Sequence, residues 1–227
     1  MKIAEAFYSI QGEGRLAGTP SVFLRTSGCN LRCVWCDTPY TSWSPEGKDW
    51  TLEELLAWVR RQGCPYVVIT GGEPMIQPDL ETLCAGLRGL CSHITIETAG
   101  TVYRDLACDL MSISPKLANS TPWEREEGRF ADQHDRLRYQ PSVLRRLLAR
   151  YDCQLKFVVQ QPDDLEEIGV IAKEIGATPA QVMLMAEGTT AGGIHDREEW
   201  IVEACKSLGY RYSPRLHVLI WGNRRGV

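Results

Sequence analysis

The order of apolar and polar positions along the chain predicts alternating strands and helices. Seven short, continuously apolar runs are typical of parallel strands covered on both faces; they span residues 21–27, 66–70, 93–98, 110–114, 154–160, 182–187 and 210–216. Five segments with a helical period lie among them, at 51–63, 78–89, 140–151, 163–176 and 196–209. This alternation predicts an α/β fold, either a βα barrel or a doubly wound sheet.

Local signals mark where the helices begin and end. Thr51 with Glu54 three residues later has the pattern of a capping box, and Asp163 and Asp196 are candidate N-caps. Glycines suited to end a helix follow three of the segments, at Gly63, Gly176 and Gly209. Residues 119–140 fit neither period and are strongly charged, so we expect a surface loop or lid there.

Most of the predicted strands end in polar residues. After residues 21–27 comes a loop with three cysteines, and the later strands end at Gly71-Gly72-Glu73, Glu97, Ser114 and Lys116, Gln160 and Glu187. In parallel α/β folds the site forms at the carboxyl ends of the strands. We therefore expect these side chains to surround one opening.

Length and composition narrow the class of protein. The chain has 227 residues, which suits one α/β domain over 1–227, and its net charge of −4 argues against a nucleic-acid-binding surface. The first residues lack the apolar run of a signal peptide, and no apolar stretch is long enough to cross a bilayer. We expect a cytoplasmic protein without a membrane or nucleic-acid partner.

Three of the nine cysteines, Cys29, Cys33 and Cys36, lie within eight residues. A four-iron cluster held by three cysteines keeps one iron open to bind and activate another molecule. The alternatives are a zinc site completed by His93, Cys64 or His195, and three buried thiols. The other cysteines are expected to be small buried hydrophobes: Cys64, Cys84, Cys91, Cys108, Cys153 and Cys205.

The spacing C-x-x-x-C-x-x-C, followed after a strand by Gly-Gly-Glu-Pro at 71–74, resembles the radical S-adenosylmethionine enzymes. The resemblance implies a [4Fe–4S] cluster on the three cysteines, with S-adenosylmethionine on the open iron. Reductive cleavage of the sulfonium then supplies a 5′-deoxyadenosyl radical. The residues that it implies around this cofactor are Asp37, Gly71, Gly72, Glu73, Glu97, Ser114, Lys116 and Gln160.

Further motifs resemble one family within that superfamily, 7-carboxy-7-deazaguanine synthase (QueE). They are YSIQGEG at 8–14, CDTPYT at 36–41, ETAGT at 97–101, SPK at 114–116 and SPRLHVLIWGNRRGV at 213–227. The family implies an abbreviated, distorted partial TIM-type (β/α)6-like barrel and a homodimer. It also implies conversion of 6-carboxy-5,6,7,8-tetrahydropterin to 7-carboxy-7-deazaguanine with loss of ammonia, a need for Mg²⁺, and a flavodoxin-like reductant.

The resemblance also assigns substrate residues. Glu13 would accept from adjacent N–H groups of the pterin, although outside this family a solvated Glu in a glycine-rich turn is the simpler interpretation. Arg25, a charge in an apolar strand, pairs either with the substrate carboxylate or within the protein. The full set is Ile10, Gln11, Glu13, Gly14, Arg25, Thr70, His217 and Val227, with Thr38 as the Mg²⁺ ligand. The tail either folds back over the site or frays.

Three rival functions remain open at this point. A glycyl-radical activase shares the cysteines and the GGEP motif, but it should lack the QGEG segment and the RLH…GV ending. A zinc or iron–sulfur binding module would not need polar residues at the ends of so many strands. An electron-transfer protein usually ligates its cluster completely, which three cysteines do not do.

Overall fold

The computed structural model describes all residues 1–227 and contains one nine-stranded sheet with the order β3-β1-β2-β4-β5-β6-β7-β8-β9. The strands are β1 Lys2–Ile10, β2 Pro20–Thr26, β3 Lys48–Asp49, β4 Tyr66–Gly71, β5 His93–Thr98, β6 Leu110–Ile113, β7 Cys153–Val159, β8 Val182–Ala186 and β9 Arg211–Tyr212. From β2 to β9 every neighbouring pair is parallel, whereas β1 pairs antiparallel with both β2 and β3. The sheet is open, because β3 and β9 form its two edges.

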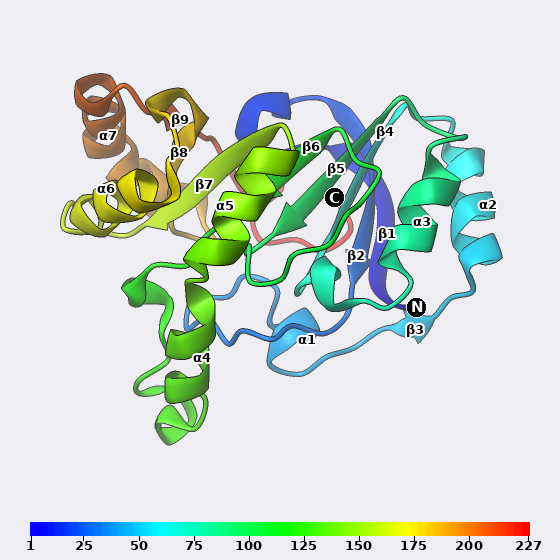
Figure 1. Cartoon of the computed structure of the whole chain (residues 1–227), viewed down its shortest axis with the longest axis horizontal. Helices are drawn as coiled ribbons and strands as arrows, with labels where there is room; N and C mark the ends of the chain where they lie inside the picture. The colour runs from blue at the N-terminus through cyan, green and yellow to red at the C-terminus, as the bar shows by residue number, and fades with distance from the viewer.

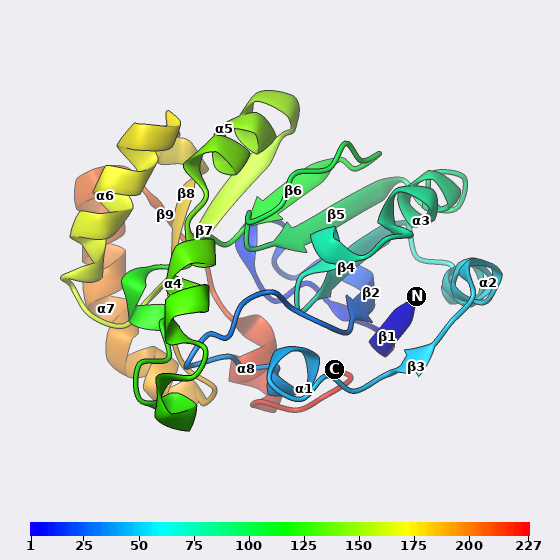
Figure 2. The same ribbon diagram turned by 60° about the horizontal axis from the view of Figure 1, so that its bottom comes forward.

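Helices lie on both sides of this curved sheet (Figures 1 and 2). Their bounds are α1 Pro39–Ser42, α2 Leu52–Gln62, α3 Leu80–Leu87, α4 Ala131–Arg138, α5 Pro141–Arg150, α6 Asp164–Ile175, α7 Ala191–Leu208 and α8 Leu216–Trp221. The longer helices α2, α3, α5, α6 and α7 lie outside the arc of strands, while α1, α8 and the C-terminal tail lie on its inner side (Figure 2). No helix is long and apolar enough to cross a membrane.

Strand alternation divides the sheet into an apolar face and a mixed face. Successive side chains of a strand point to opposite faces. The residues of one face are buried in the main apolar core together with the outer helices; among them are Val22, Leu24, Val67, Ile69, Ile94, Ile96, Met111, Ile113, Leu155, Phe157, Leu184 and Ala186. Their neighbours on the other face include Arg25, Thr70, Glu97, Ser112 and Lys156. The same periodicity that builds the core therefore presents polar groups on the inner side.

The parallel α/β architecture agrees with the sequence prediction, and several boundaries are confirmed. Thr51 and Glu54 form the expected capping box of α2, and Gly63, Gly176 and Gly209 end their helices in the left-handed conformation. The other two N-cap predictions differ in outcome, and for Asp163 the position is confirmed, because this residue is the N-cap of α6. The Asp163 side chain makes no capping bond, whereas Asp164 Oδ2 accepts from the backbone N–H groups of Gln160 and Gln161.

The N-cap prediction at Asp196 was wrong, because α7 begins earlier, where Thr190 Oγ1 accepts from the N–H of Gly193. The sequence pattern also missed strand β1, and the segment 210–216 forms only the two-residue strand β9. In β1 only Ile3 is buried, so this strand carries no continuous apolar run to detect.

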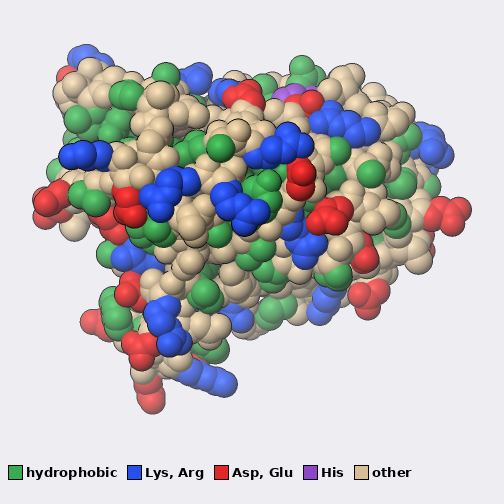
Figure 3. All heavy atoms as spheres, in the orientation of Figure 1, with side chains coloured by type: hydrophobic (Ala, Val, Ile, Leu, Met, Phe, Trp, Pro, Cys, Tyr) green, Lys and Arg blue, Asp and Glu red, His purple; other side chains and the backbone are tan.

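The charged segment 119–140 is not simply a loop, because α4 lies within it and projects from the body of the molecule (Figure 1). On the face drawn in Figure 3, acidic and basic side chains both occur on this projection. The mixed charge agrees with the sequence, where Glu and Asp alternate with Arg.

Candidate active site

The inner face of the sheet lines a cavity of about 410 Å³. Residues from seven strands line it: Glu5, Phe7 and Ile10 from β1, Phe23 and Arg25 from β2, Thr70 from β4, Glu97 from β5, Ser112 from β6, Lys156 and Val158 from β7, and Met185 from β8. The wall also includes the cysteine loop, α1, the turn after β1, residues that follow β5, β6 and β8, and the C-terminal segment from Arg215 to Val227. The carboxyl ends of the parallel strands thus open into one space, as the sequence predicted.

The three cysteines of the loop face this cavity as free thiols. The Leu31 N–H points at Cys29 Sγ at 3.3 Å, and Cys36 Sγ lies 3.3 Å from the Ser42 hydroxyl. Such contacts suit sulfur ligands of an iron–sulfur cluster, whose potential depends on hydrogen bonds to sulfur. Burial raises the pKa of Cys29 and of Cys33 to about 12, so the free thiols are neutral and poor nucleophiles.

The cysteine geometry separates a cluster from a single metal ion. No three His, Cys, Asp or Glu side chains gather closely enough to hold one ion. The zinc site completed by His93, Cys64 or His195 is therefore contradicted by the structure. A four-iron cluster needs no such convergence, because each cysteine binds a different iron. The donor set, three thiols beside a cavity without a fourth cysteine, fits a cluster with one open corner.

The GGEP motif supports the cysteine loop from behind. A Cβ atom on Gly72 would lie 2.8 Å from Cys29 Cβ and would overlap the Gly28 carbonyl, so only glycine permits this packing. The Glu73 N–H donates to the Gly28 carbonyl oxygen at 2.9 Å. Gly71 and Gly72 also line the cavity. The two glycines thus bring the β4 end and the cysteine loop into direct contact.

Glu73 does not occupy the position expected from the sequence. Its side chain is fully buried, and its carboxylate accepts from Thr98 Oγ1 at 2.7 Å, Ala99 N at 2.8 Å and Met75 N at 3.0 Å. These bonds occupy the carboxylate inside the protein, away from the cavity lining. In this structure the Glu73 carboxylate joins the end of β4 to the end of β5.

The segment 119–140 supports the other side of the cysteine loop, so it is not a lid over the cavity. His134 is buried, its Nδ1 accepts from the Arg32 N–H at 2.9 Å, and its Nε2 lies 2.9 Å from Ser120 Oγ. Val34 N donates to the Ser120 carbonyl at 2.8 Å. Burial lowers the pKa of His134 to about 4, which keeps the imidazole neutral as these bonds require.

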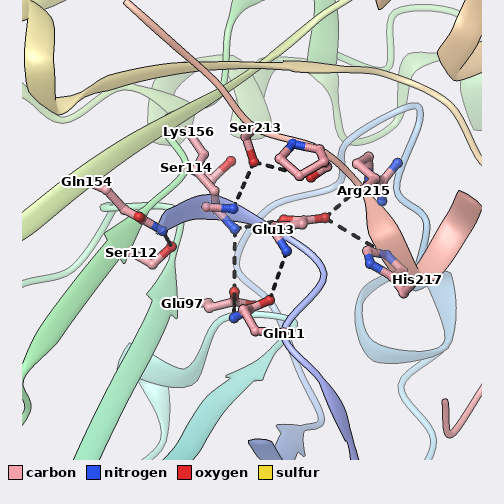
Figure 4. Close-up of polar contacts among 12 residues, drawn as sticks. Gln11, Glu13, Glu97, Ser112, Ser114, Gln154, Lys156, Ser213, Arg215 and His217 are labelled. Carbon is pink, nitrogen blue, oxygen red and sulfur yellow. Dashed lines mark hydrogen bonds and ion pairs between the residues drawn. The ribbon is translucent and has the colours of Figure 1, made fainter. Parts of the chain in front are cut away.

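The most polar part of the cavity surrounds Glu13 (Figure 4). Its Oε2 accepts from Lys156 Nζ at 2.7 Å, its Oε1 accepts from Arg215 Nε at 3.2 Å, and His217 Nε2 lies 3.9 Å away. Burial alone would raise the pKa of Glu13, but Lys156 and Arg215 outweigh it and hold the pKa below its usual value. Glu13 is therefore a largely buried, ionised carboxylate, with its side chain 15% exposed, and not the solvated group of the simpler interpretation.

Neighbouring backbone and side chains fix the turn that carries Glu13. Gly14 N donates to Ser213 Oγ at 2.8 Å, and Arg15 N donates to Gln154 Oε1 at 3.0 Å. Gly14 has a φ of +69° and lies against the Gln154 side chain, so glycine is required there. Gln11 Nε2 donates to Glu97 Oε1 at 3.2 Å, which connects the turn to the end of β5.

The C-terminal tail folds back across the open side of the sheet. Ser213 N donates to the Leu184 carbonyl in β8, and Leu216 N donates to the Gly12 carbonyl after β1. Farther along, Arg225 Nε donates to Glu5 Oε1 at 3.1 Å. Residues 223–227, including Val227, line the cavity. The tail is thus part of the wall and not a frayed terminus.

Arg25 is paired within the protein. Its Nε donates to Glu5 Oε2 at 2.9 Å, and the same oxygen accepts from Tyr40 Oη at 2.7 Å. The guanidinium also lies 5.8 Å from the centre of the Phe7 ring. Arg25 still lines the cavity, and only its Nε is engaged by Glu5.

Known proteins share both the motifs and the fold. The Radical SAM superfamily model matches residues 23–119. The 7-carboxy-7-deazaguanine synthase of Rhodopirellula baltica is 44% identical over 226 residues, which cover 99% of this chain and 88% of that protein. The synthase of Halobacterium salinarum is 45% identical over 234 residues, covering 98% and 91% respectively. The chain belongs to the 7-carboxy-7-deazaguanine synthase family.

Solved structures agree with this membership. QueE from Escherichia coli superposes with a TM-score of 0.70 at 27% identity, covering 95% of this chain and 94% of that one. SuiB from Streptococcus suis is only 13% identical with a TM-score of 0.56, so it shares the fold alone. The chain thus has the radical SAM fold, a mixed α/β architecture built on one nine-stranded sheet.

Most residues expected from the synthase family meet at the cavity. Its lining includes Ile10, Gln11, Glu13, Arg25, Cys29, Cys33, Cys36, Asp37, Thr38, Thr70, Gly71, Gly72, Glu97, Ser114, Lys116, His217 and Val227. Gln160 is not among them, and its carbonyl accepts from Arg197 Nε at 3.3 Å. Gly14 and Glu73 are also outside the lining and shape it from behind.

Sequence reasoning missed several cavity residues that contact, directly or through one another, those expected from the synthase family. They include Lys156, Arg215, Glu5 and Tyr40. Lys156 carried a usable signal, because it is a charge inside an apolar strand, which is how Arg25 was found. Arg215 lies in the quoted C-terminal motif, but nothing local shows that its partners are Glu13 and Asp37.

Proposed function

We propose that this chain is a lyase that converts 6-carboxy-5,6,7,8-tetrahydropterin to 7-carboxy-7-deazaguanine with release of ammonia. The observation that carries the proposal is the meeting, in one cavity, of a three-cysteine loop and the largely buried, ionised carboxylate of Glu13. The loop suits a cluster with an open iron, and the carboxylate suits the N–H donors of a pterin. Substrate and product differ by one ammonia, so the reaction needs no net oxidant.

Cys29, Cys33 and Cys36 would hold a [4Fe–4S] cluster with S-adenosylmethionine on its open iron. When bound, these groups supply a 5′-deoxyadenosyl radical that removes and returns a substrate hydrogen. Around this site Lys116 Nζ donates to the Ser114 carbonyl and hydroxyl at 2.8 and 2.7 Å. Its ammonium thus stays at the cavity wall, where it can pair with the carboxylate of S-adenosylmethionine.

The pterin would lie on the Glu13 side of the cavity. Its 2-amino group and adjacent ring N–H donate in parallel, which matches a carboxylate whose two oxygens are held in place. Gln11 and Glu97, joined by a hydrogen bond of 3.2 Å, lie next to this position, so Glu97 fits the substrate side better than the cofactor side assigned from the sequence. Arg25, which lines the cavity, would donate to the substrate carboxylate.

Mg²⁺ would bind through Thr38 and the substrate. The Thr38 hydroxyl lies 3.8 Å from Cys36 Sγ and 3.4 Å from Thr41 Oγ1. The neighbouring Asp37 carboxylate is already paired with Arg215, so the protein offers no oxygen cage. A hard cation that keeps several waters can still use one hydroxyl together with substrate oxygens. The ion is expected to bind well only when substrate is present.

The family resemblance supports three further predictions: a flavodoxin-like electron donor, a homodimer and a cytoplasmic location.

The test is an anaerobic assay of the iron-reconstituted protein with S-adenosylmethionine, dithionite, Mg²⁺ and 6-carboxytetrahydropterin, analysed by mass spectrometry. The expected result is a product lighter by one ammonia without matching consumption of S-adenosylmethionine. The Cys33→Ala variant is the control and should form none. Slow formation of 5′-deoxyadenosine that does not depend on the pterin would support the radical site but contradict the proposed substrate. It would favour the glycyl-radical activase.

A further inference from the structure

Five charged side chains of alternating sign form a continuous row across the cavity floor. In order they are Glu97, Lys156, Glu13, Arg215 and Asp37. We propose, on the basis of the function proposed above, that Lys156 and Arg215 are positioning residues that aim Glu13 at the ligand and so select a pterin edge composed of N–H donors.

Each oxygen of Glu13 has its own cation. Lys156 Nζ lies 2.7 Å from Oε2 and Arg215 Nε lies 3.2 Å from Oε1. Both cations are almost fully buried, with side chains 4% and 7% exposed, so solvent screens these pairs little. Because the two cations hold different oxygens, the carboxylate cannot rotate freely, and both oxygens keep lone pairs for a ligand (Figure 4).

The net charge of the row explains its selectivity. It contains three carboxylates and two permanent cations. Burial lowers the pKa of the adjacent His217, so this imidazole does not supply the missing positive charge. One carboxylate therefore remains without its own cation. A ligand edge of N–H donors relieves this excess, whereas an edge of acceptors adds to it.

Arg215 also joins segments that are far apart in the sequence. Its guanidinium donates to the Gly188 carbonyl, to Asp37 in the cysteine loop and to Glu13 after β1. Asp37 directly follows the third cysteine. One buried side chain thus sets the spacing between the carboxylate that would hold the pterin and the loop that would hold the cluster.

The pH dependence of ligand binding distinguishes a positioning role of Lys156 from a purely structural salt bridge. If the salt bridge were purely structural, its removal would leave the pH dependence of ligand binding unchanged. The groups that face Glu13 are Lys156 from β7, Glu97 from β5, Asp37 from the cysteine loop, and Arg215 and His217 from the C-terminal segment. Burial raises the pKa of Glu13 and the charge of Lys156 lowers it. Removal of Lys156 therefore raises the pKa of Glu13. A larger share of the carboxyl group is then protonated as the pH falls, and the protonated form accepts less well from the N–H groups of the ligand.

The test measures equilibrium binding of 6-carboxytetrahydropterin to the reconstituted protein with S-adenosylmethionine and Mg²⁺ but without reductant. For the wild type we expect a Kd that changes less than about twofold between pH 8.5 and 6. For Lys156→Met we expect binding about 10- to 100-fold weaker at pH 6, with partial recovery toward pH 8.5. Lys156→Arg should recover most of the affinity and the flat profile.

A double-mutant cycle and a second ligand complete the test. Lys156→Met should have little additional effect on binding in a Glu13→Gln background, since the group it positions is gone. The wild type should bind the 2-oxo analogue, 6-carboxytetrahydrolumazine, at least about 100-fold more weakly. This measurement needs no variant, so it stands even if Lys156→Met fails to retain its fold or cluster absorbance.

Two results would overturn the inference: a pH-independent affinity of folded Lys156→Met, or equal binding of the pterin and the lumazine by the wild type. Both differ from failure of the proposed function, in which the wild type does not bind or convert the pterin at all.

Discussion

Gly12 packs directly against the imidazole of His217, and a Cβ atom at this position would overlap the ring. Since His217 lines the cavity beside Glu13, the missing side chain of Gly12 decides where the imidazole can lie.

We therefore expect Gly12→Ala to raise the KM for the pterin about tenfold or more, because even a small displacement of a binding group weakens the productive geometry. Steady-state kinetics on the reconstituted protein measure this effect. Gly169→Ala is the matched control: Gly169 lies within α6 with nothing near its Cβ position. It should leave kinetics unchanged and add about 0.5–1 kcal/mol of stability. Unchanged kinetics in Gly12→Ala would contradict the prediction.

Gly72→Ala should disrupt the contact between the end of β4 and the cysteine loop. The new methyl group would press on the Gly28 carbonyl and on Cys29 Cβ, so we expect a loss of about 1–3 kcal/mol in the free energy of unfolding. The cysteine loop should also hold its cluster less well. Iron content per chain after reconstitution and urea unfolding measure the two effects, and normal iron content in the variant would refute the second.

Arg225→Ala should release the tail without unfolding the protein. Arg225 lies 3.7 Å from the centre of the Tyr40 ring and pairs with Glu5 and Glu46 at 3.1 Å each. The side chain is half exposed, so its loss should cost less than about 1 kcal/mol of stability. We expect faster removal of the tail by carboxypeptidase and a higher KM. The neighbouring Arg224→Ala, which removes no ion pair, should have smaller effects on both; equal effects would refute a specific Arg225 contact.

The buried imidazole of His134 should make stability depend on pH. Burial lowers its pKa from 6.5 to about 4, so between these values the unfolded chain binds more protons than the folded one. The contribution of His134 to stability is complete above about pH 6.5 and is lost as the pH falls toward 4, by roughly 2 kcal/mol after partial solvent screening.

Urea unfolding at several pH values between 5 and 7.5 measures this slope in the protein and in His134→Asn. The variant should be less stable at pH 7.5 but should lose less stability on acidification. His195→Asn is the control, because His195 is 85% exposed on α7. Parallel curves for the wild type and His134→Asn would contradict the assignment.

Local patterns in the sequence determined most of the strands, several helix ends and the cysteine loop of this protein. Continuous apolar runs identified the parallel strands, because a strand buried on both faces needs apolar residues at nearly every position. Thr51, Glu54 and the glycines at helix ends act within one turn of chain, so their roles are visible without a fold. The spacing of Cys29, Cys33 and Cys36 likewise defines one short loop. Where a segment was half exposed, as in β1, this signal was absent.

Only the tertiary structure decided which charges meet. Lys156 and Glu13 are 143 residues apart, Arg215 and Asp37 are 178 apart, and Arg225 and Glu5 are 220 apart. Their pairing depends on the order and register of the sheet and on the return of the tail across its open side. The same holds for Glu73, whose motif suggested a ligand contact while its buried surroundings gave it Thr98, Ala99 and Met75 instead. A sequence motif specifies the functional group of a side chain. The residues that this side chain contacts are determined by tertiary packing, which brings together segments far apart in the sequence.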